Sequence, residues 1–298
     1  MTRNFSLQFE AIGTRWRVDV YEPVHERLCL QIKEKIFGYI ECFESTYSRF
    51  RTDSRISQLA QKKGKISLSS DEYTLFSLYE RLYRLTNGIF TPLIGNLLVE
   101  AGYDETYSLQ PSELHSPPDW DNVLSVTDTT LELCSPALID IGAAGKGYLI
   151  DRIGEILHAE GIHSFCVDGS GDLLVSDLHG EKLEVGLEHP LDTTQVIGIV
   201  RIQNESLCAS AGNRRKWGQF HHIIDPHTLE SPSAILATFV VAKHAMLADA
   251  LSTCLFLVPS ELLLHEFSFE YALVRDDLSL EVSPKFPGHF FTSASSID

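Results

Sequence analysis

Positive charge is scarce in this 298-residue sequence: 24 Lys and Arg stand against 41 Asp and Glu, a formal net charge of -17 at pH 7. A chain with this excess is repelled at long range by nucleic-acid phosphates and by anionic membranes, so we expect no nucleic-acid partner. An anionic small ligand would need local help from a metal ion, a lysine or the N-terminus of a helix.

Long hydrophobic runs are missing as well. The first residues contain neither an apolar signal core nor a lipid-attachment cysteine, and the longest later apolar run, near ALSTCLFLV, is too short to span a bilayer. The six cysteines form no C-x-x-C pair and lie mostly inside apolar segments. We therefore expect no membrane span, a cytoplasmic location and buried, reduced thiols.

Internal repeats, low-complexity tracts and linkers rich in Pro, Gly or Ser are also absent. The composition, with 44% hydrophobic and 22% charged residues, is that of an ordinary globular protein. These observations favour one compact unit over residues 1–298.

Local patterns predict strands and helices, and each type is grouped along the chain. RWRVDVY alternates like a strand, and residues 28–47 carry an apolar stripe at three- and four-residue steps, typical of an amphipathic helix. Ser69 and Glu72 predict a capping box at the start of a second helix, which should end at Asn87 and Gly88. Two strands flank a DGSGD turn, and AMLADALSTCLFLV is typical of a helix. This grouping favours an α+β fold with mixed β-sheets and packed helices.

The stretch ALIDIGAAGKGYLID, residues 137–151, looks like a phosphate loop but fails its spacing. A Walker loop needs four residues between its first Gly and the Gly-Lys pair, followed by Ser or Thr. Here only two alanines separate Gly142 from Gly145 and Lys146, and Gly147 follows. Small residues still let the backbone approach a ligand closely. Two interpretations stay open: a nucleotide contact, or a tight turn with Lys146 in solvent.

Two neighbouring histidines, His221 and His222, precede an IIDP turn. Adjacent residues of a strand point to opposite faces, so at most one of them can face a given site. A histidine is close to its neutral form at pH 7 and could act as a general base. The alternative is a histidine in the core or on the surface.

Asp249 and Thr253 lie four residues apart in a helical pattern, which places their oxygens on one face, one turn apart. A carboxylate and a hydroxyl suit a hard cation such as Mg²⁺ better than zinc. Asp249 lies within an apolar run, where a buried carboxylate must be paired or metal-bound. The alternative is an exposed aspartate and a packed threonine.

Seven segments, in order along the chain, resemble the FAD:protein FMN transferase family, also called the ApbE family. The resemblance covers roughly residues 13–258, in the segments IGTRW, SRFRTDSRIS, TNGIFTPLIGNLL, DIGAAGKGYLID, VDGSGDLLVS, HHIIDPHT and ADALSTCLF. Members of that family bind FAD and Mg²⁺, transfer FMN onto a threonine hydroxyl of an acceptor flavoprotein, and release AMP. The resemblance therefore implies a transferase with FAD as substrate, Mg²⁺ as cofactor and a flavoprotein as partner.

The resemblance also implies roles for single residues. It implies a metal site made by Asp249, Thr253 and the backbone carbonyl of Ala143. It implies that Lys146 neutralises phosphate charge and that His222 is the general base. The remaining flavin-nucleotide contacts that it implies are Asp140, Lys146, Ile12, Phe50, Ile89, Phe90 and Thr91.

The sequence departs from the family pattern at several positions. Thr91 stands where the family usually has Asp, and Gly145 stands where it has Ala. Ala211 and Asn213 lie in a segment that usually reads S-G-D, and Leu229 replaces a Gly. Two other functions therefore stay open: an Mg²⁺-dependent FAD diphosphatase that produces FMN and AMP, and a non-catalytic FAD-binding protein.

Overall fold

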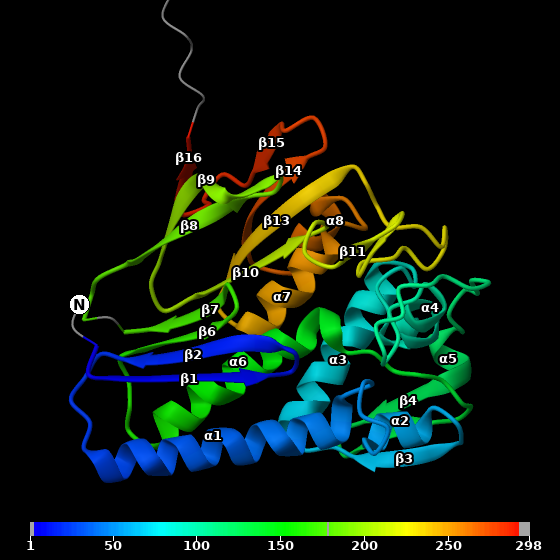
Figure 1. Cartoon of the computed structure of the whole chain (residues 1–298), viewed down its shortest axis with the longest axis horizontal. Helices are drawn as coiled ribbons and strands as arrows, with labels where there is room; N and C mark the ends of the chain where they lie inside the picture. The colour runs from blue at the N-terminus through cyan, green and yellow to red at the C-terminus, as the bar shows by residue number, and fades with distance from the viewer. Residues whose placement is uncertain (1–2, 178, 292–298) are drawn as a thin grey trace, which may run out of the picture.

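An eight-stranded sheet forms the centre of the protein, whose computed structural model describes residues 3–177 and 179–291 (Figure 1). In spatial order its strands are β1 (Phe5–Ala11), β2 (Thr14–Val20), β6 (Phe165–Gly169), β7 (Asp172–Ser176), β10 (Ser206–Ala211), β13 (Ile235–Ala242), β14 (Glu270–Arg275) and β15 (Leu280–Val282). Tight turns join β1 to β2 and β6 to β7, and such turns require antiparallel neighbours.

Three smaller sheets accompany the central one in the described part of the chain. The first contains β16 (Gly288–Phe290), β9 (Asp192–Ile202) and β8 (Leu183–His189); the second contains β3 (Gly64–Ser67), β5 (Thr130–Leu133) and β4 (Leu124–Thr127); the third is the hairpin of β11 (Lys216–Trp217) and β12 (Phe220–His221). The expected α+β fold is confirmed, and its described strand pairs are antiparallel rather than mixed in direction.

The helices are α1 (Glu26–Tyr47), α2 (Arg55–Leu59), α3 (Ser70–Leu85), the 3-10 turn η1 (Pro92–Ile94), α4 (Gly95–Glu100), α5 (Trp120–Val123), α6 (Gly142–Ala159), α7 (Ala245–Cys254) and α8 (Ser260–Leu264). Within residues 3–177 and 179–291, no helix combines the length and the apolar character needed to cross a membrane. The capping box predicted for α3 is present: the Ser69 side chain accepts from the Glu72 amide, and the Glu72 side chain accepts from the Ser69 amide.

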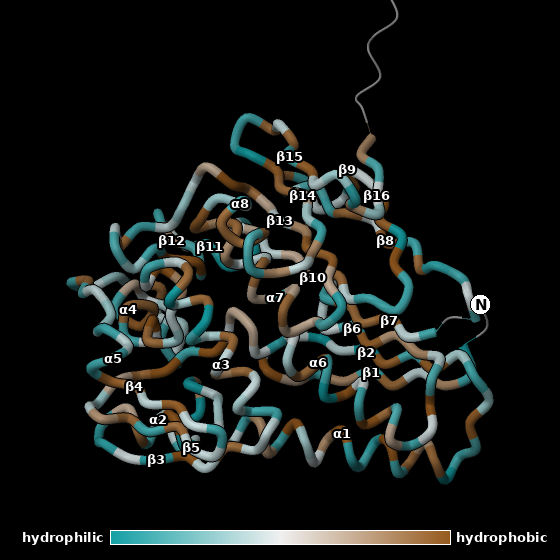
Figure 2. Tube along the Cα trace, turned by 180° about the vertical axis from the view of Figure 1, so that it is seen from behind, coloured by the Kyte–Doolittle hydropathy of each residue, from teal (hydrophilic) through white to brown (hydrophobic). Residues whose placement is uncertain are grey.

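The middle of the central sheet is buried on both faces. Val240 of β13 lies in an apolar cluster with α1, α3, α6 and α7, whereas its neighbours Phe239 and Val241 lie in a second cluster with β8, β9 and β16. Figure 1 shows α1 and α6 on one side of the sheet and β8, β9 and β16 on the other. Along α1 the trace alternates between hydrophilic and hydrophobic residues, as expected for a helix with one face on the core (Figure 2).

The expectation that all cysteines are buried is wrong for half of them. Cys166, Cys208 and Cys254 are buried, whereas Cys29 is half-buried and both Cys42 and Cys134 are exposed; all six are free thiols. Cys42 lies on the solvent side of α1, and Cys134 follows the buried Leu133 at the end of β5. Whether a cysteine is buried therefore depends on the face of the helix or strand on which it lies, and not on how apolar its sequence neighbours are.

Helices α6 and α7 are held in a fixed register by two contacts. The Asp151 carboxylate accepts hydrogen bonds from the amides of Ala245 and Met246, both at 2.9 Å, and so caps the start of α7. One turn earlier, the Gly147 amide donates to Asp249 Oδ2 at 2.8 Å. Through these contacts the glycine-rich segment at the start of α6 lies against the LADALSTC segment of α7.

Candidate functional site

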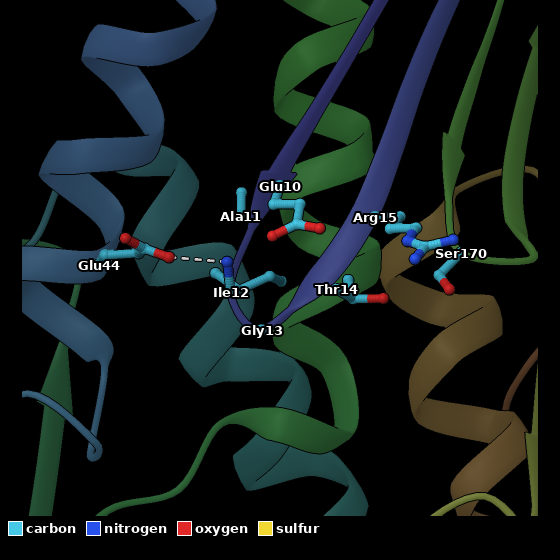
Figure 3. Close-up of a pocket in the computed structure, with 8 residues that line it drawn as sticks. All are labelled: Glu10, Ala11, Ile12, Gly13, Thr14, Arg15, Glu44 and Ser170. Carbon is cyan, nitrogen blue, oxygen red and sulfur yellow. Dashed lines mark hydrogen bonds between the residues drawn. The ribbon is translucent and has the colours of Figure 1, made fainter.

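Several chain turns meet at one end of the central sheet. The β1–β2 turn at Ile12 and Gly13 lies beside Ser170 of the β6–β7 turn, and together they line an open cavity of about 660 Å³. Figure 3 shows Arg15 beside Ser170, with the Glu44 carboxylate reaching the Ile12 amide. Asp172, the first residue of β7, follows this turn directly and belongs to the first charged cluster.

That charged cluster consists of Lys146, Asp172 and Asp249. Lys146 Nζ forms an ion pair with Asp172, whose other oxygen accepts from the Ala209 amide at 2.9 Å. Asp172 and Asp249 are only 1% and 4% exposed. Burial lowers the pKa of Lys146, but the carboxylates of Asp172 and Asp249 outweigh it, and the net pKa lies above the ordinary value. Lys146 is therefore a cation held in place by Asp172, with its side chain half-buried.

Asp249 is a buried carboxyl group whose ionised form Lys146 only partly stabilises. Burial and the neighbouring Asp172 raise the pKa of the Asp249 carboxyl to about 7, although Lys146 and the Gly147 amide oppose the rise. Among the described residues, Asp249 Oδ1 accepts no hydrogen bond, whereas Oδ2 accepts from Gly147. A buried carboxylate with an available oxygen is suited to a cation.

The other expected metal ligands lie close to Asp249. Thr253 follows one turn later on α7, and its hydroxyl is 3.5 Å from the Ser210 hydroxyl. Ala143 lies in the first turn of α6, one turn before Gly147, whose amide donates to Asp249. No group of three or more His, Cys, Asp and Glu able to hold a metal occurs in the described ranges. The groups gathered here, a carboxylate, a hydroxyl and a backbone carbonyl, are oxygen donors of the kind that Mg²⁺ takes in proteins.

The two adjacent histidines have different surroundings. His221 Nδ1 accepts from the Ile223 amide at 3.2 Å, so its Nε2 donates to the Pro232 carbonyl at 2.9 Å. Both nitrogens are thus engaged in holding the loop. His222 Nδ1 is enclosed and has no hydrogen-bond partner among the described residues. Burial, followed by the charges of Arg215, His221 and Lys146, lowers the pKa of His222 to about 3. The imidazole of His222 is therefore neutral at pH 7.

Asp140 is fully engaged by protein groups. Its Oδ1 accepts from the Gly142 amide at 2.6 Å, and its Oδ2 pairs with Arg49 Nε at 2.5 Å. The Arg49 guanidinium carbon lies 4.1 Å from the centre of the Phe50 ring. The structure thus places Asp140 and Phe50 in a second cluster, joined by Arg49, at the start of α6.

The remaining predicted contacts are spread around these clusters. Ile12 has a φ of 45°, which is strained for a β-branched residue, and its amide donates to Glu44 Oε1 at 2.7 Å. The Thr91 hydroxyl accepts from the Leu93 amide at 3.1 Å and so begins η1; Ile89 is half-buried. Phe90 is 3% exposed and stacks on Tyr79 in the core.

Three residues with clear roles here were not among the predicted site residues: Asp172, Arg49 and Asp151. Asp172 is the last residue of the DGSGD turn, and its position in that turn was the available signal. Arg49 and Asp151 lie within quoted segments, but their partners, Asp140 and the start of α7, are 91 and 94 residues away in sequence. No local pattern reveals such pairs.

Known proteins resemble this chain over most of its length. A curated relative from Treponema pallidum, named FAD:protein FMN transferase, is 28% identical over 304 residues, which cover 89% of this chain and 82% of the relative. A second, from Buchnera aphidicola and with the same name, is 23% identical and covers 86% of this chain and 80% of its own length.

Solved structures share the fold. The flavin transferase ApbE from Vibrio cholerae has a TM-score of 0.79 at 21% identity, covering 95% of this chain and 97% of its own. The ApbE protein from Thermotoga maritima also has a TM-score of 0.79 at 21% identity, covering 94% and 97%. The sequence model of the ApbE family matches residues 12–268, which include both charged clusters and the histidine pair. The chain therefore belongs to the ApbE family.

Proposed function

We propose that this protein is an Mg²⁺-dependent FAD:protein FMN transferase, which moves FMN from FAD onto a threonine hydroxyl of an acceptor flavoprotein and releases AMP. The observation that carries the proposal is the charged cluster between α6 and β7, in which Lys146 pairs with Asp172 and the buried Asp249 accepts from the Gly147 amide. The shared name of the curated relatives supports the same reaction.

Asp249, Thr253 and the Ala143 carbonyl would hold the metal. When bound, Mg²⁺ supplies positive charge to the pyrophosphate oxygens of FAD. Lys146 would bind the same phosphates, because its ammonium group is held in place by Asp172 and its side chain remains partly exposed.

His222 would remove the proton from the incoming hydroxyl. Its low pKa means that the ring is unprotonated before substrate arrives, as a base must be. The negative charge of a bound pyrophosphate would raise that pKa toward the range useful for catalysis. The acceptor oxygen attacks the phosphorus attached to FMN, the bond from this phosphorus to the AMP oxygen breaks, and the hydroxyl proton passes to His222. No nucleophile from this chain is required.

We also propose that residues 1–298 form a single functional unit. The larger apolar cluster takes members from Leu7 to Leu273 and includes residues of α1, α3, α6 and α7, so the segments that carry the site share one core. This arrangement supports a single unit, since a boundary inside it would divide a continuous set of packed side chains.

The function is tested by mass spectrometry of products after the protein is mixed with FAD and Mg²⁺, with and without a flavoprotein acceptor domain. We expect the mass of FMN to be added to the acceptor, with AMP in solution, and both to disappear with EDTA. Free FMN and AMP at a rate that the acceptor does not change would identify a diphosphatase. If FAD binds to the protein but stays intact and no product forms, the protein is a non-catalytic FAD-binding protein.

A further inference from the structure

The segment that enters the β11–β12 hairpin carries the longest run of basic residues in the sequence: Arg214, Arg215 and Lys216. No Asp or Glu occurs in residues 206–224, which surround this run. Asn213 contributes to this, because it lies where the family segment usually has an Asp. The hairpin is therefore locally positive on a protein whose formal net charge is -17.

Two of these three cations are available to a partner. The Arg214 guanidinium pairs with Glu188 of β8 at 2.6 Å, so its charge is largely offset. Arg215 and Lys216 are exposed, and neither forms an ion pair with another residue that the structure describes. Exposed charges of one sign steer the approach of an oppositely charged group and fix its position on the surface. Arg215 and Lys216 are therefore suited to an anionic group that comes from solution.

The same hairpin holds the candidate base. The His222 amide donates to the Arg215 carbonyl at 3.1 Å, and Lys216 lies opposite His221 in the β11–β12 pair. After burial, the charge of Arg215 is the largest cause of the low pKa of His222, as expected for a guanidinium close to the imidazole. The two available cations thus lie beside the residue that an acceptor hydroxyl must reach.

The hairpin is fixed to the body of the protein, although it lies at the edge of the molecule (Figure 1). Trp217 Nε1 donates to the Ala101 carbonyl at 2.7 Å, and the Trp217 ring stacks on Tyr103 with the ring centroids 5.6 Å apart. Before the basic run, the Gly212 amide donates to the Leu236 carbonyl at 3.2 Å. Charges on a backbone that is held at both ends keep their positions, so they can select a partner by where its charges lie.

We propose that Arg215 and Lys216 form a docking surface for the acceptor protein, and that they bind acidic side chains next to its target threonine. The inference rests on the proposed function, in which a protein supplies the attacking hydroxyl. The excess of Asp and Glu on the rest of the chain repels an acidic segment, whereas the basic run attracts it. The charge pattern therefore favours an approach that brings the threonine beside His222.

The test measures, by fluorescence anisotropy, the binding of two labelled peptides with a central threonine, flanked by Glu in one and by Gln in the other. Arg215→Gln combined with Lys216→Gln removes both charges, and Arg215→Lys combined with Lys216→Arg keeps them. The matched control is Lys62→Gln combined with Lys63→Gln, which changes the net charge equally. Lys62 and Lys63 are also consecutive and exposed, and they lie between α2 and β3, far from β11 in Figure 1. Thermal unfolding confirms that each variant is folded.

We expect the wild type to bind the Glu peptide about tenfold more tightly than the Gln peptide, the effect of two exposed charge pairs, and to lose this preference at high salt. Removal of both hairpin charges should abolish the preference, whereas the charge-keeping variant and the Lys62/Lys63 control should retain it. The affinity for ADP reports on phosphate binding. Equal binding of the two peptides by the wild type would overturn the proposal. The same would follow if the control lost the preference, or if the hairpin variant lost as much affinity for ADP as for the Glu peptide.

The outcome for the docking surface is separable from that for the function. If the wild type transfers FMN to an acceptor domain, and removal of both hairpin charges leaves the KM for that domain unchanged, only the docking proposal fails. If the Glu peptide is preferred as expected but no FMN is transferred, the docking surface stands and the transferase reaction does not. If neither peptide is preferred and no FMN is transferred, both proposals fail.

Discussion

Gly147 is the position where a single methyl group should separate the two helices of the site. A Cβ added there would lie 2.5 Å from the carbonyl carbon of Ala245 and 2.8 Å from Asp249 Cβ, and closer still to the Ala245 oxygen. Carbon atoms pack at about 3.5 to 4.0 Å, so Gly147→Ala requires α6 and α7 to move apart by about 1 Å. Both Asp249 and the amide that bonds to it lie in this contact.

The expected cost follows from two opposing effects. Overpacking in a close-packed interior costs about 1 to 3 kcal/mol, and replacing a helical Gly by Ala returns up to about 1 kcal/mol. We add a share of the Gly147–Asp249 hydrogen bond, which is worth about 1 kcal/mol. The net loss in the free energy of unfolding is about 2 kcal/mol, which corresponds to a Tm lowered by about 3 °C in a protein of this size.

Gly145→Ala is the matched control on the same helix. Its added Cβ would meet only the Ile141 side chain, at 3.2 and 3.3 Å, and the end of Phe43 at 3.5 Å. These side chains can adjust by a few tenths of an ångström, so we expect a change in the free energy of unfolding within about 1 kcal/mol of zero. Alanine is also the residue that the family usually has at this position.

Urea unfolding and Mg²⁺-dependent thermal shifts provide the assay. Gly147→Ala should lose stability and also most of the Tm increase that Mg²⁺ gives the wild type, because Asp249 is displaced. Gly145→Ala should keep both. If the two variants have the same stability and the same response to Mg²⁺, the close contact between α6 and α7 does not position Asp249, and the reasoning is refuted.

Three further predictions concern single charges. Asp249→Asn should abolish the Mg²⁺-dependent Tm increase while the protein stays folded; a response equal to that of the wild type would place the metal elsewhere. Lys146→Met leaves Asp172 buried and unpaired, so it should cost about 3 to 5 kcal/mol in urea unfolding, and adding Asp172→Asn should restore most of that loss. Folding lowers the pKa of His222 from 6.5 to about 3, so protonation favours the unfolded chain and stability falls as the pH drops through this window. From about pH 7.5 to pH 5 the loss is about 2 kcal/mol, and His222→Gln should remove that part of the pH dependence; an unchanged pH profile would contradict the burial of the ring.

Local signals in the sequence predicted much of the architecture. The capping residues Ser69 and Glu72, and the apolar stripe of residues 28–47, depend on neighbours three or four positions apart, and both are found in α3 and α1. The wrong prediction concerned Cys42 and Cys134, where an apolar neighbourhood was weighed above the periodicity of the element. The sequence therefore indicated which segments are helices and strands, but it did not always indicate whether a side chain faces the core or the solvent.

The site was only partly predictable, because its charges are paired across the fold. The segment around Lys146 indicates a ligand contact, but nothing near it in sequence shows that Asp172 pairs with it. In the same way, no pattern near Asp140 shows that its carboxylate pairs with Arg49, which follows α1. Such pairs depend on strand order and helix packing, which periodicity does not encode.

The two contacts between α6 and α7 hold these helices together as one rigid pair. Asp151 holds the first turn of α7 and Gly147 holds its middle, so α7 cannot slide along α6 or rotate against it without breaking one of the two. In the metal site that we propose, the oxygens of Ala143, Asp249 and Thr253 come from two helices that are held in register. Binding of a cation there would require little further ordering of its ligands, because folding already fixes the two helices.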